Sequence, residues 1–178
     1  ATASVIAHAS ELGIVNVIGG SLGFFNVDAA VLMCDFVNFL PSDKVVLEIL
    51  ETVEVTPELV ARVTELAGKG YTFALDDVIS HTEALQKLLP LVKIIKIDIT
   101  GMSKDDMTRL VSHFKQDNKL LLAEKVETIE QFQVCMELGF HYFQGYYFAR
   151  PVILSGKKLA PSQLAIMQLM TLVATDAS

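Results

Sequence analysis

The chain has 178 residues, of which 52 % are hydrophobic, and its mean hydropathy is +0.45. Its 14 basic and 21 acidic residues leave a formal net charge of −7. This length suits one domain with a substantial core, and the high apolar fraction favours an α/β fold whose strands are covered on both faces. Duplex nucleic acid is excluded as an expected partner, because binding it requires a Lys/Arg surface that this composition does not provide.

The sequence also bears on the compartment. No uninterrupted apolar stretch approaches the ~20 residues of a membrane helix, so we expect no membrane contact. The first residues show no signal peptide pattern. Cys34 and Cys135 both fall in predicted helices, far apart and without a CxxC companion. We therefore expect two core thiols in a reducing cytoplasm.

Strands and helices are predicted to alternate along the whole chain. Capping residues mark several helix starts: Asp28, Thr56 followed by Pro57, and Ser103. The predicted helices are 1–12, 29–40, 57–69, 82–89, 104–116, 128–138 and 161–173. The predicted strands are 24–27, 44–50, 71–76, 92–98, 119–123 and 141–143.

This alternation predicts parallel strands with right-handed crossovers. Either a doubly wound open sheet or a (β/α)₈ barrel fits. The barrel is favoured because every strand, and not one switch point, ends in a polar group. A full barrel needs ~250 residues, so we expect 1–178 to be a single barrel domain that lacks about two strands at its N-terminus. Residues 161–178 are expected to form a last helix that leads to a missing domain.

Polar groups close the apolar strands. The run 71–75 ends in the pair Asp76-Asp77, and adjacent carboxylates need a cation to stay ionised, because like charges raise each other's pKa. Alternate residues of a strand share a face. Lys96 and Asp98 should therefore both point inward, as should Glu124 on the next strand.

Such inward charges cost several kcal/mol each unless they are paired or bound to a metal. Two interpretations stay open. In one, Lys96 forms a purely structural network with Asp76, Asp98 and Glu124. In the other, oxygen donors bind Mg²⁺ or Mn²⁺, Lys96 and Glu124 position and deprotonate a water, and a phosphodiester is hydrolysed. The expected metal ligands are Asn26, Glu48, Asp76 and Asp77, and Gln144 is expected to contact the ligand or to support the site.

These motifs resemble the EAL domain of bacterial cyclic di-GMP signalling over nearly the whole chain. The resemblance implies a modified TIM barrel that cleaves cyclic di-GMP to linear pGpG with Mg²⁺ or Mn²⁺, and it gives Glu51 the role of anchoring the loop after Asp77. The matching segments are Phe25-Asn26-Val27, Leu47-Glu48-Ile49-Leu50-Glu51-Thr52, Leu75-Asp76-Asp77, Ile95-Lys96-Ile97-Asp98, Ala123-Glu124-Lys125-Val126-Glu127-Thr128 and Gln144-Gly145-Tyr146-Tyr147-Phe148 with Pro151.

Within the family, the segments 45–59, 123–128 and 156–161 resemble the branch in which an EAL-like domain precedes an HDOD domain, as in YuxH-like proteins. The chain departs from the family pattern in three ways. No E-[AV]-L signature precedes Asn26, the loop 78–82 has neither glycine of the family pattern, and Lys125 replaces a glycine and crowds the site.

We therefore expect a cytoplasmic, phosphodiesterase-like domain with much of its metal site retained but with weak or absent turnover. The alternatives are a non-catalytic cyclic di-GMP sensor and a regulatory module that docks other proteins. The expected partners are cyclic di-GMP, a protein partner or the missing HDOD domain, and a second copy in a homodimer.

Overall fold

The computed structural model describes residues 19–78, 83–115 and 117–149. The chain divides into two compact units, and every element described here belongs to the one that spans Gly20–Val152. The helices expected at 1–12 and 161–173 lie outside the described residues, as does the loop 79–82.

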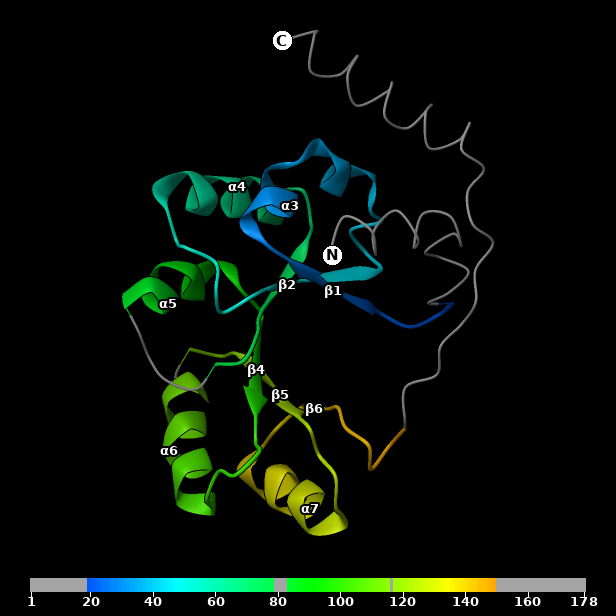
Figure 1. Cartoon of the computed structure of the whole chain (residues 1–178), viewed down its shortest axis with the longest axis vertical. Coiled ribbons are helices and arrows are strands. Elements are labelled where there is room, and N and C mark those ends of the chain that lie inside the picture. Colours follow the sequence, from blue (N-terminus) through cyan, green and yellow to red (C-terminus); the bar gives the residue numbers. More distant parts are fainter. Residues whose placement is uncertain (1–18, 79–82, 116, 150–178) are drawn as a thin grey trace, which may run out of the picture. The chain divides into compact units, whose positions relative to one another are not determined.

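The described residues form one parallel sheet of six strands in the order β1-β2-β3-β4-β5-β6. Each strand thus pairs with the next one along the chain, which is the order of a barrel wall and not of a doubly wound sheet. Figure 1 shows the twisted sheet that these strands form, with the helices outside it. The strands are Gly23–Val27 (β1), Val45–Ile49 (β2), Thr72–Leu75 (β3), Ile94–Asp98 (β4), Leu120–Glu124 (β5) and Tyr142–Phe143 (β6).

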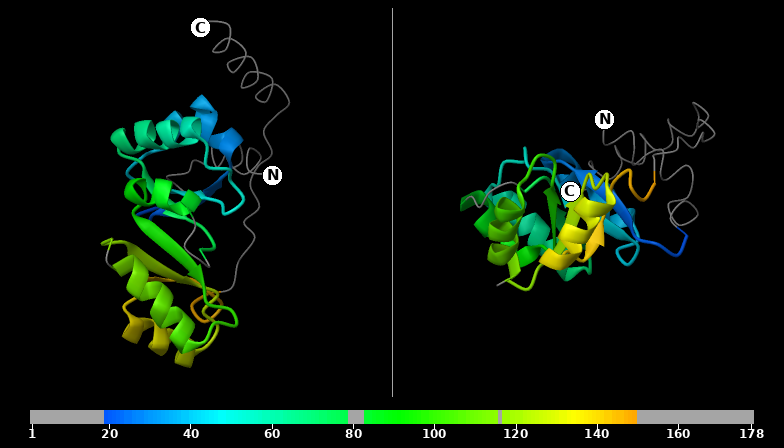
Figure 2. Two further views of the ribbon diagram at one scale, coloured as in Figure 1. Left: turned by 90° about the vertical axis from the view of Figure 1, so that its left-hand side faces the viewer. Right: turned by 90° about the horizontal axis from the view of Figure 1, so that it is seen from below.

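Helices connect the strands and lie along the outer side of the sheet (Figure 2). Apolar residues recur at helical spacing on the side of each long helix that faces the sheet. In α4 these residues are Leu59, Val63 and Leu66, which are all buried. The three expected caps are present: Asp28 accepts from Val31 N at 2.8 Å, Thr56 Oγ1 from Leu59 N at 3.2 Å and Ser103 Oγ from Asp106 N at 3.1 Å. In addition, Thr128 forms a capping box with Gln131. The α-helices are Ala29–Met33 (α3), Pro57–Gly68 (α4), Glu83–Leu88 (α5), Lys104–Lys115 (α6) and Ile129–Leu138 (α7), and 3₁₀ helices span Asp35–Phe39 (η1) and Leu89–Leu91 (η2).

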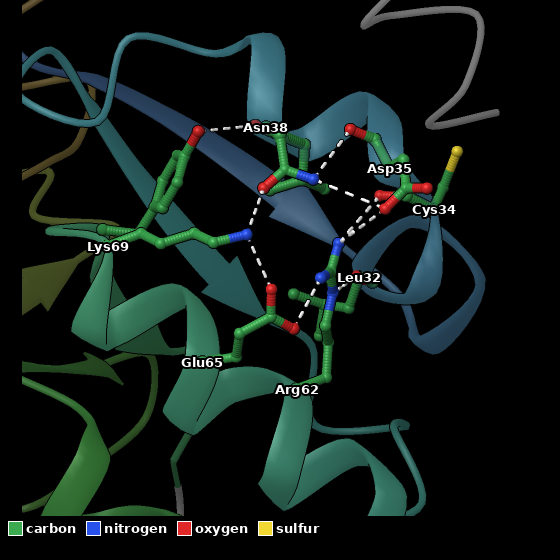
Figure 3. A network of polar contacts seen from close by, with 9 residues as sticks. Leu32, Cys34, Asp35, Asn38, Arg62, Glu65 and Lys69 are labelled. Atoms are coloured by element: carbon green, nitrogen blue, oxygen red, sulfur yellow. Dashed lines mark hydrogen bonds and ion pairs between the residues drawn. The ribbon is translucent and has the colours of Figure 1, made fainter. Parts of the chain in front are cut away.

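The predicted helix 29–40 is wrong, because the chain breaks at Cys34. This residue is extended (φ −81°, ψ 136°) between α3 and η1. Figure 3 shows Arg62, from α4, reaching toward this break. Its Nε donates to the carbonyl of Leu32 at 3.0 Å, and Nη2 donates to that of Cys34 at 3.4 Å. A guanidinium from another helix thus satisfies carbonyls that a continuous helix would bond internally.

The break also decides the environment of one thiol. Cys34 is exposed, so the expectation that it is a core thiol is wrong, whereas Cys135 is fully buried in α7 as expected. Burial raises the pKa of the Cys135 thiol to about 11. Both cysteines are free thiols.

The inner face of the sheet carries an apolar layer directly below the charged strand ends. Val46, Ala74, Ile94 and Leu122, from four neighbouring strands, form one buried cluster, with Leu120 packed against it. Two residues further along the same strands lie Glu48, Asp76, Lys96 and Glu124, which therefore share that face. The predicted inward direction of Lys96 and Glu124 is confirmed. Within the described residues, no helix has the length and apolar character needed to cross a bilayer.

Candidate functional site

Lys96 lies at the centre of the charged strand ends. Its side chain is only 4 % exposed, and its Nζ lies 2.6 Å from Asp76 Oδ1, 2.9 Å from Glu124 Oε1 and 3.0 Å from Glu48 Oε1. The three carboxylates come from β2, β5 and the end of β3, so parallel register brings them to one buried ammonium. This network matches part of the structural interpretation, but Glu48 takes the place expected for Asp98.

A second grouping of carboxylates overlaps the first. One oxygen each of Asp76, Asp77 and Glu124 can be chosen so that all three lie within 4.8 Å of one another. Glu124 Oε2 is buried and has no hydrogen-bond partner among the described residues. A buried carboxylate oxygen without a donor is costly, and hard oxygen donors at this spacing fit a divalent cation such as Mg²⁺ or Mn²⁺. The residues present therefore fit the metal expected from the sequence.

The electrostatics of these carboxylates indicate the same need for positive charge. Burial raises the pKa of both Glu48 and Glu124, and the nearby carboxylates Asp76 and Asp77 raise it further, while Lys96 opposes the shift only in part. Burial lowers the pKa of Lys96, but its contacts with Asp76, Glu124 and Glu48 outweigh burial and raise this pKa above its ordinary value. Lys96 is thus held as an ammonium, yet it does not fully compensate the surrounding acids.

The backbone around Asp77 holds the acidic pair in place. Asp76 N donates to the carbonyl of Ile49 at 3.0 Å, and Val78 N donates to that of Lys96 at 3.0 Å. Asp77 between them has a φ of 46°, a left-handed conformation that Asp tolerates better than most residues. Neighbouring strands on both sides therefore determine where the two carboxylates project.

Asn26 belongs to the same strand-end row but is exposed. It is the register partner of Glu48, on the adjacent parallel strand, so their Cα atoms are about 4.8 Å apart. Of the four expected metal ligands, the structure groups Asp76 and Asp77 with Glu124, which the sequence assigned to the attacking water. Glu48 contacts Lys96 instead, and the ligand roles of Asn26 and Glu48 stay predictions.

Asp98 does not contact Lys96 but forms an ion pair with Lys125. Asp98 Oδ1 also accepts from Thr100 N at 2.8 Å. Together these contacts lower the pKa of Asp98 against the effect of its partial burial. Lys125, which follows β5, therefore points to the end of the neighbouring strand β4, and sequence reasoning missed this pair. The signal was present, because Asp98 and Glu124 are register partners and Lys125 directly follows Glu124.

Two further expected site residues are exposed. Gln144 follows β6, and its backbone bridges two strand ends: its N–H donates to Ala123 O at 2.8 Å and its carbonyl accepts from Val126 N at 3.0 Å. Glu51 follows β2. The loop that Glu51 was expected to anchor lies outside the described residues, so the roles of both side chains stay predictions.

The sequence matches the EAL domain family over residues 28–151. The chain therefore belongs to the EAL domain family, as its motifs indicated. The fold described above and the acidic strand ends are consistent with that membership.

Two curated relatives illustrate the likeness. The chain is 39 % identical over 132 residues to the cyclic di-GMP phosphodiesterase CdgJ of Vibrio cholerae, covering 73 % of this chain and 30 % of that protein. It is 31 % identical over 160 residues to the uncharacterised protein YuxH of Bacillus subtilis, covering 88 % of this chain and 39 % of that protein. The chain thus spans about a third of the length of these relatives.

Solved structures support the fold. Klebsiella pneumoniae BlrP1, in a complex with manganese and cyclic di-GMP, is 25 % identical with a TM-score of 0.64, over 83 % of this chain and 42 % of that one. The Bacillus subtilis YkuI protein, with an EAL domain bound to cyclic di-GMP and calcium, has a TM-score of 0.61 at 24 % identity, over 87 % of this chain and 43 % of that one. The six described strands thus correspond to part of an EAL-type barrel.

Proposed function

We propose that this chain carries the divalent-metal centre of an EAL-type, phosphodiesterase-like signalling domain that recognises cyclic di-GMP. The observation that carries this proposal is the group formed by Asp76, Asp77 and Glu124, with oxygens within 4.8 Å of one another. Relatives named as cyclic di-GMP phosphodiesterases, and EAL structures that hold cyclic di-GMP with manganese or calcium, support the same ligand and metal class.

The roles of the charged residues follow from their contacts. A bound Mg²⁺ or Mn²⁺ would neutralise the carboxylates and make a water more acidic. Lys96 Nζ holds Glu124 through Oε1 at 2.9 Å, and Oε2 has no hydrogen-bond partner among the described residues. With the metal held chiefly by Asp76 and Asp77, this oxygen beside the metal would accept the proton of an attacking water. Asn26 and Glu48 would add oxygen donors next to the group, while Gln144 and Asp98 lie on the same rim.

Turnover by this chain is proposed to be weak or absent. Lys96 lies 2.6 Å from Asp76 Oδ1 and 2.9 Å from Glu124 Oε1, so its charge competes with a metal for two of the three carboxylates. The sequence 78–82, Val-Ile-Ser-His-Thr, has no glycine to follow the backbone path of the family loop. Non-catalytic binding of cyclic di-GMP is the second candidate function, and the same competition favours it.

We further propose that 1–178 form a single EAL-like domain of a bacterial cytoplasmic protein. The alignment with YuxH, which covers 88 % of this chain, supports that extent. A protein partner, an HDOD domain or a second copy of the chain would bind outside the carboxylate group.

Incubation with cyclic di-GMP and Mn²⁺, followed by chromatography for pGpG, tests the proposal. We expect slow formation of pGpG, at least about a hundredfold slower in Glu124→Gln, because a general base contributes about 10²–10⁴. Glu137→Gln is the matched control, since this exposed residue of α7 pairs only with exposed Lys104 in the described contacts. A kcat of the wild type at the ordinary enzymatic level of about 10 s⁻¹ would contradict weak turnover.

Calorimetry separates the remaining outcomes. Binding of cyclic di-GMP that depends on Mn²⁺, without pGpG, would identify the sensor function. Neither binding nor pGpG would refute recognition of cyclic di-GMP and would leave the protein-docking alternative.

A further inference from the structure

Lys125 occupies an unusual backbone position next to Glu124. Its φ is 56°, in the left-handed region where a residue with a Cβ is strained and glycine is not. Despite this cost, the side chain is not simply released into solvent. It is 59 % exposed and forms an ion pair with Asp98, whose side chain is only 19 % exposed.

The two members of this pair are held very differently. Asp98 ends β4, and its other oxygen accepts the backbone N–H of Thr100. Lys125, by contrast, is held through its flexible four-carbon chain alone, and Asp98 is the ion-pair partner that the described residues give it. The ammonium can therefore leave Asp98 while Asp98 keeps its backbone hydrogen bond.

The site has fewer positive charges than carboxylates, so a second ammonium could compensate part of its negative charge. Lys96 is the buried cation of the group, and it is already shared among three carboxylates. With Asp77 included, four carboxylates face one ammonium, a surplus of three negative charges. One divalent cation would still leave a net negative site, which opposes the approach of an anionic phosphodiester.

We propose that Lys125 is a ligand-binding residue whose ammonium leaves Asp98 and pairs with a phosphate oxygen of the ligand held at the carboxylate group. This inference rests on the proposed function and adds a residue to its ligand site. Asp98 keeps the ammonium beside the strand ends until the phosphate replaces it. Since a lysine ammonium binds phosphate as a point charge, the contact adds affinity without demanding one ligand orientation.

The test is calorimetric titration of the chain with cyclic di-GMP in Mn²⁺. Lys125→Met keeps the length of the side chain and removes its charge, so we expect Kd to rise about tenfold and to depend less steeply on salt. Lys104→Met is the matched control: its ammonium is also in an exposed ion pair, 57 % exposed, but on α6 and α7. This control should leave Kd unchanged, and Lys125→Arg should restore most of the affinity.

The variant Asp98→Asn distinguishes two roles of Lys125: contact with the phosphate of the ligand, or an ion pair that only fixes the ends of β4 and β5 relative to each other. If Lys125 contacts the phosphate, freeing it from Asp98 leaves Kd unchanged or lowers it. If the pair only fixes the loops, Asp98→Asn weakens binding as Lys125→Met does, and the inference is overturned. Unchanged Kd in Lys125→Met would also overturn it, with the proposed function intact. No binding by the wild type would overturn both.

Discussion

Lys96 illustrates how one buried charge serves folding and chemistry together. A lone ammonium that is 4 % exposed would be strongly unfavourable. Three carboxylate contacts compensate its desolvation. The same contacts hold Glu124 and Asp76 within the candidate metal group. We therefore expect removal of Lys96 to lower the stability of the fold as well as any activity of the site.

Lys96→Met should therefore lower the free energy of unfolding by about 3–5 kcal/mol at neutral pH, because it leaves buried carboxylates uncompensated. Urea titration with EDTA present measures this. Lys119→Met is the control: among the described residues, the hydrogen bond of the partly buried Lys119 goes to the carbonyl of Val92, at 2.9 Å, so its loss should cost about 1 kcal/mol. Equal losses in the two variants would show that the network around Lys96 does not stabilise the fold.

Glu124 should make the metal-free protein less stable as the pH rises above the acidic range. Burial and its acidic neighbours raise the pKa of Glu124 above its usual 4.5. The folded chain therefore binds this proton more tightly than the unfolded chain. The associated stability is fully present below about pH 4.5 and is lost as the pH rises through the folded pKa.

We accordingly expect Glu124→Gln to raise Tm in EDTA at pH 8, by about 2–4 °C for each kcal/mol of relieved repulsion. The difference from the wild type should shrink as the pH is lowered through the raised pKa of the folded Glu124, because the wild-type carboxyl then takes up its proton. Thermal unfolding over a series of pH values between pH 8 and about pH 4.5 measures this. A variant that is less stable than the wild type at pH 8 would mean that the Lys96 contact outweighs burial.

Among the elements, the side-chain directions at the strand ends could be predicted from the sequence, whereas the structure of the connections between strands was harder to predict. Alternation along β4 and β5 placed Lys96 and Glu124 on the inner face, and the parallel register then brought them together. The break at Cys34 was not predictable from local sequence, because it depends on Arg62, a residue 28 positions away. The Asp98–Lys125 pair was missed because a lysine next to a site was treated as an obstruction and not as a partner.

Gly145 shows a constraint on the connection after β6 that the motif alone did not explain. A Cβ placed on Gly145 would lie 2.1 Å from Val126 O and 2.3 Å from Val126 N. The backbone of the β5–α7 connection thus passes directly against this glycine. Neighbouring Gln144 bonds the same segment, through its carbonyl to Val126 N.

Gly145→Ala should cost about 3 kcal/mol, because backbone must move to admit the methyl group. Gly101→Ala provides the control, since its φ of 70° strains any Cβ, although no atom of the described residues beyond its two chain neighbours would lie within 4 Å of that Cβ. This variant should cost only about 1 kcal/mol. Chemical denaturation of both variants measures the difference. Equal costs would show that the close approach of Val126 is not maintained in solution.

At the scale of the whole described unit, the site joins four strands that are consecutive in the sheet. Glu48 comes from β2, Asp76 follows β3, Lys96 is in β4 and Glu124 ends β5. The contacts between them run across the sheet at its carboxyl edge, while the apolar cluster below provides the packing. A cation bound there would add interactions that exist only when these strands are aligned, so binding should stabilise the unit as a whole.

Mn²⁺ should therefore raise the melting temperature of the chain. At a concentration of about 100 times Kd, linkage predicts about 2.7 kcal/mol, equivalent to about 5–10 °C for a chain of this size. Differential scanning fluorimetry with and without Mn²⁺ measures the shift. Asp76→Asn should remove it, since Asp76 belongs to the carboxylate group. Asp105→Asn, at an exposed acid in the first turn of α6, should keep it. A shift of equal size in both variants would mean that Mn²⁺ binds elsewhere, and no shift in the wild type would contradict the cation site itself.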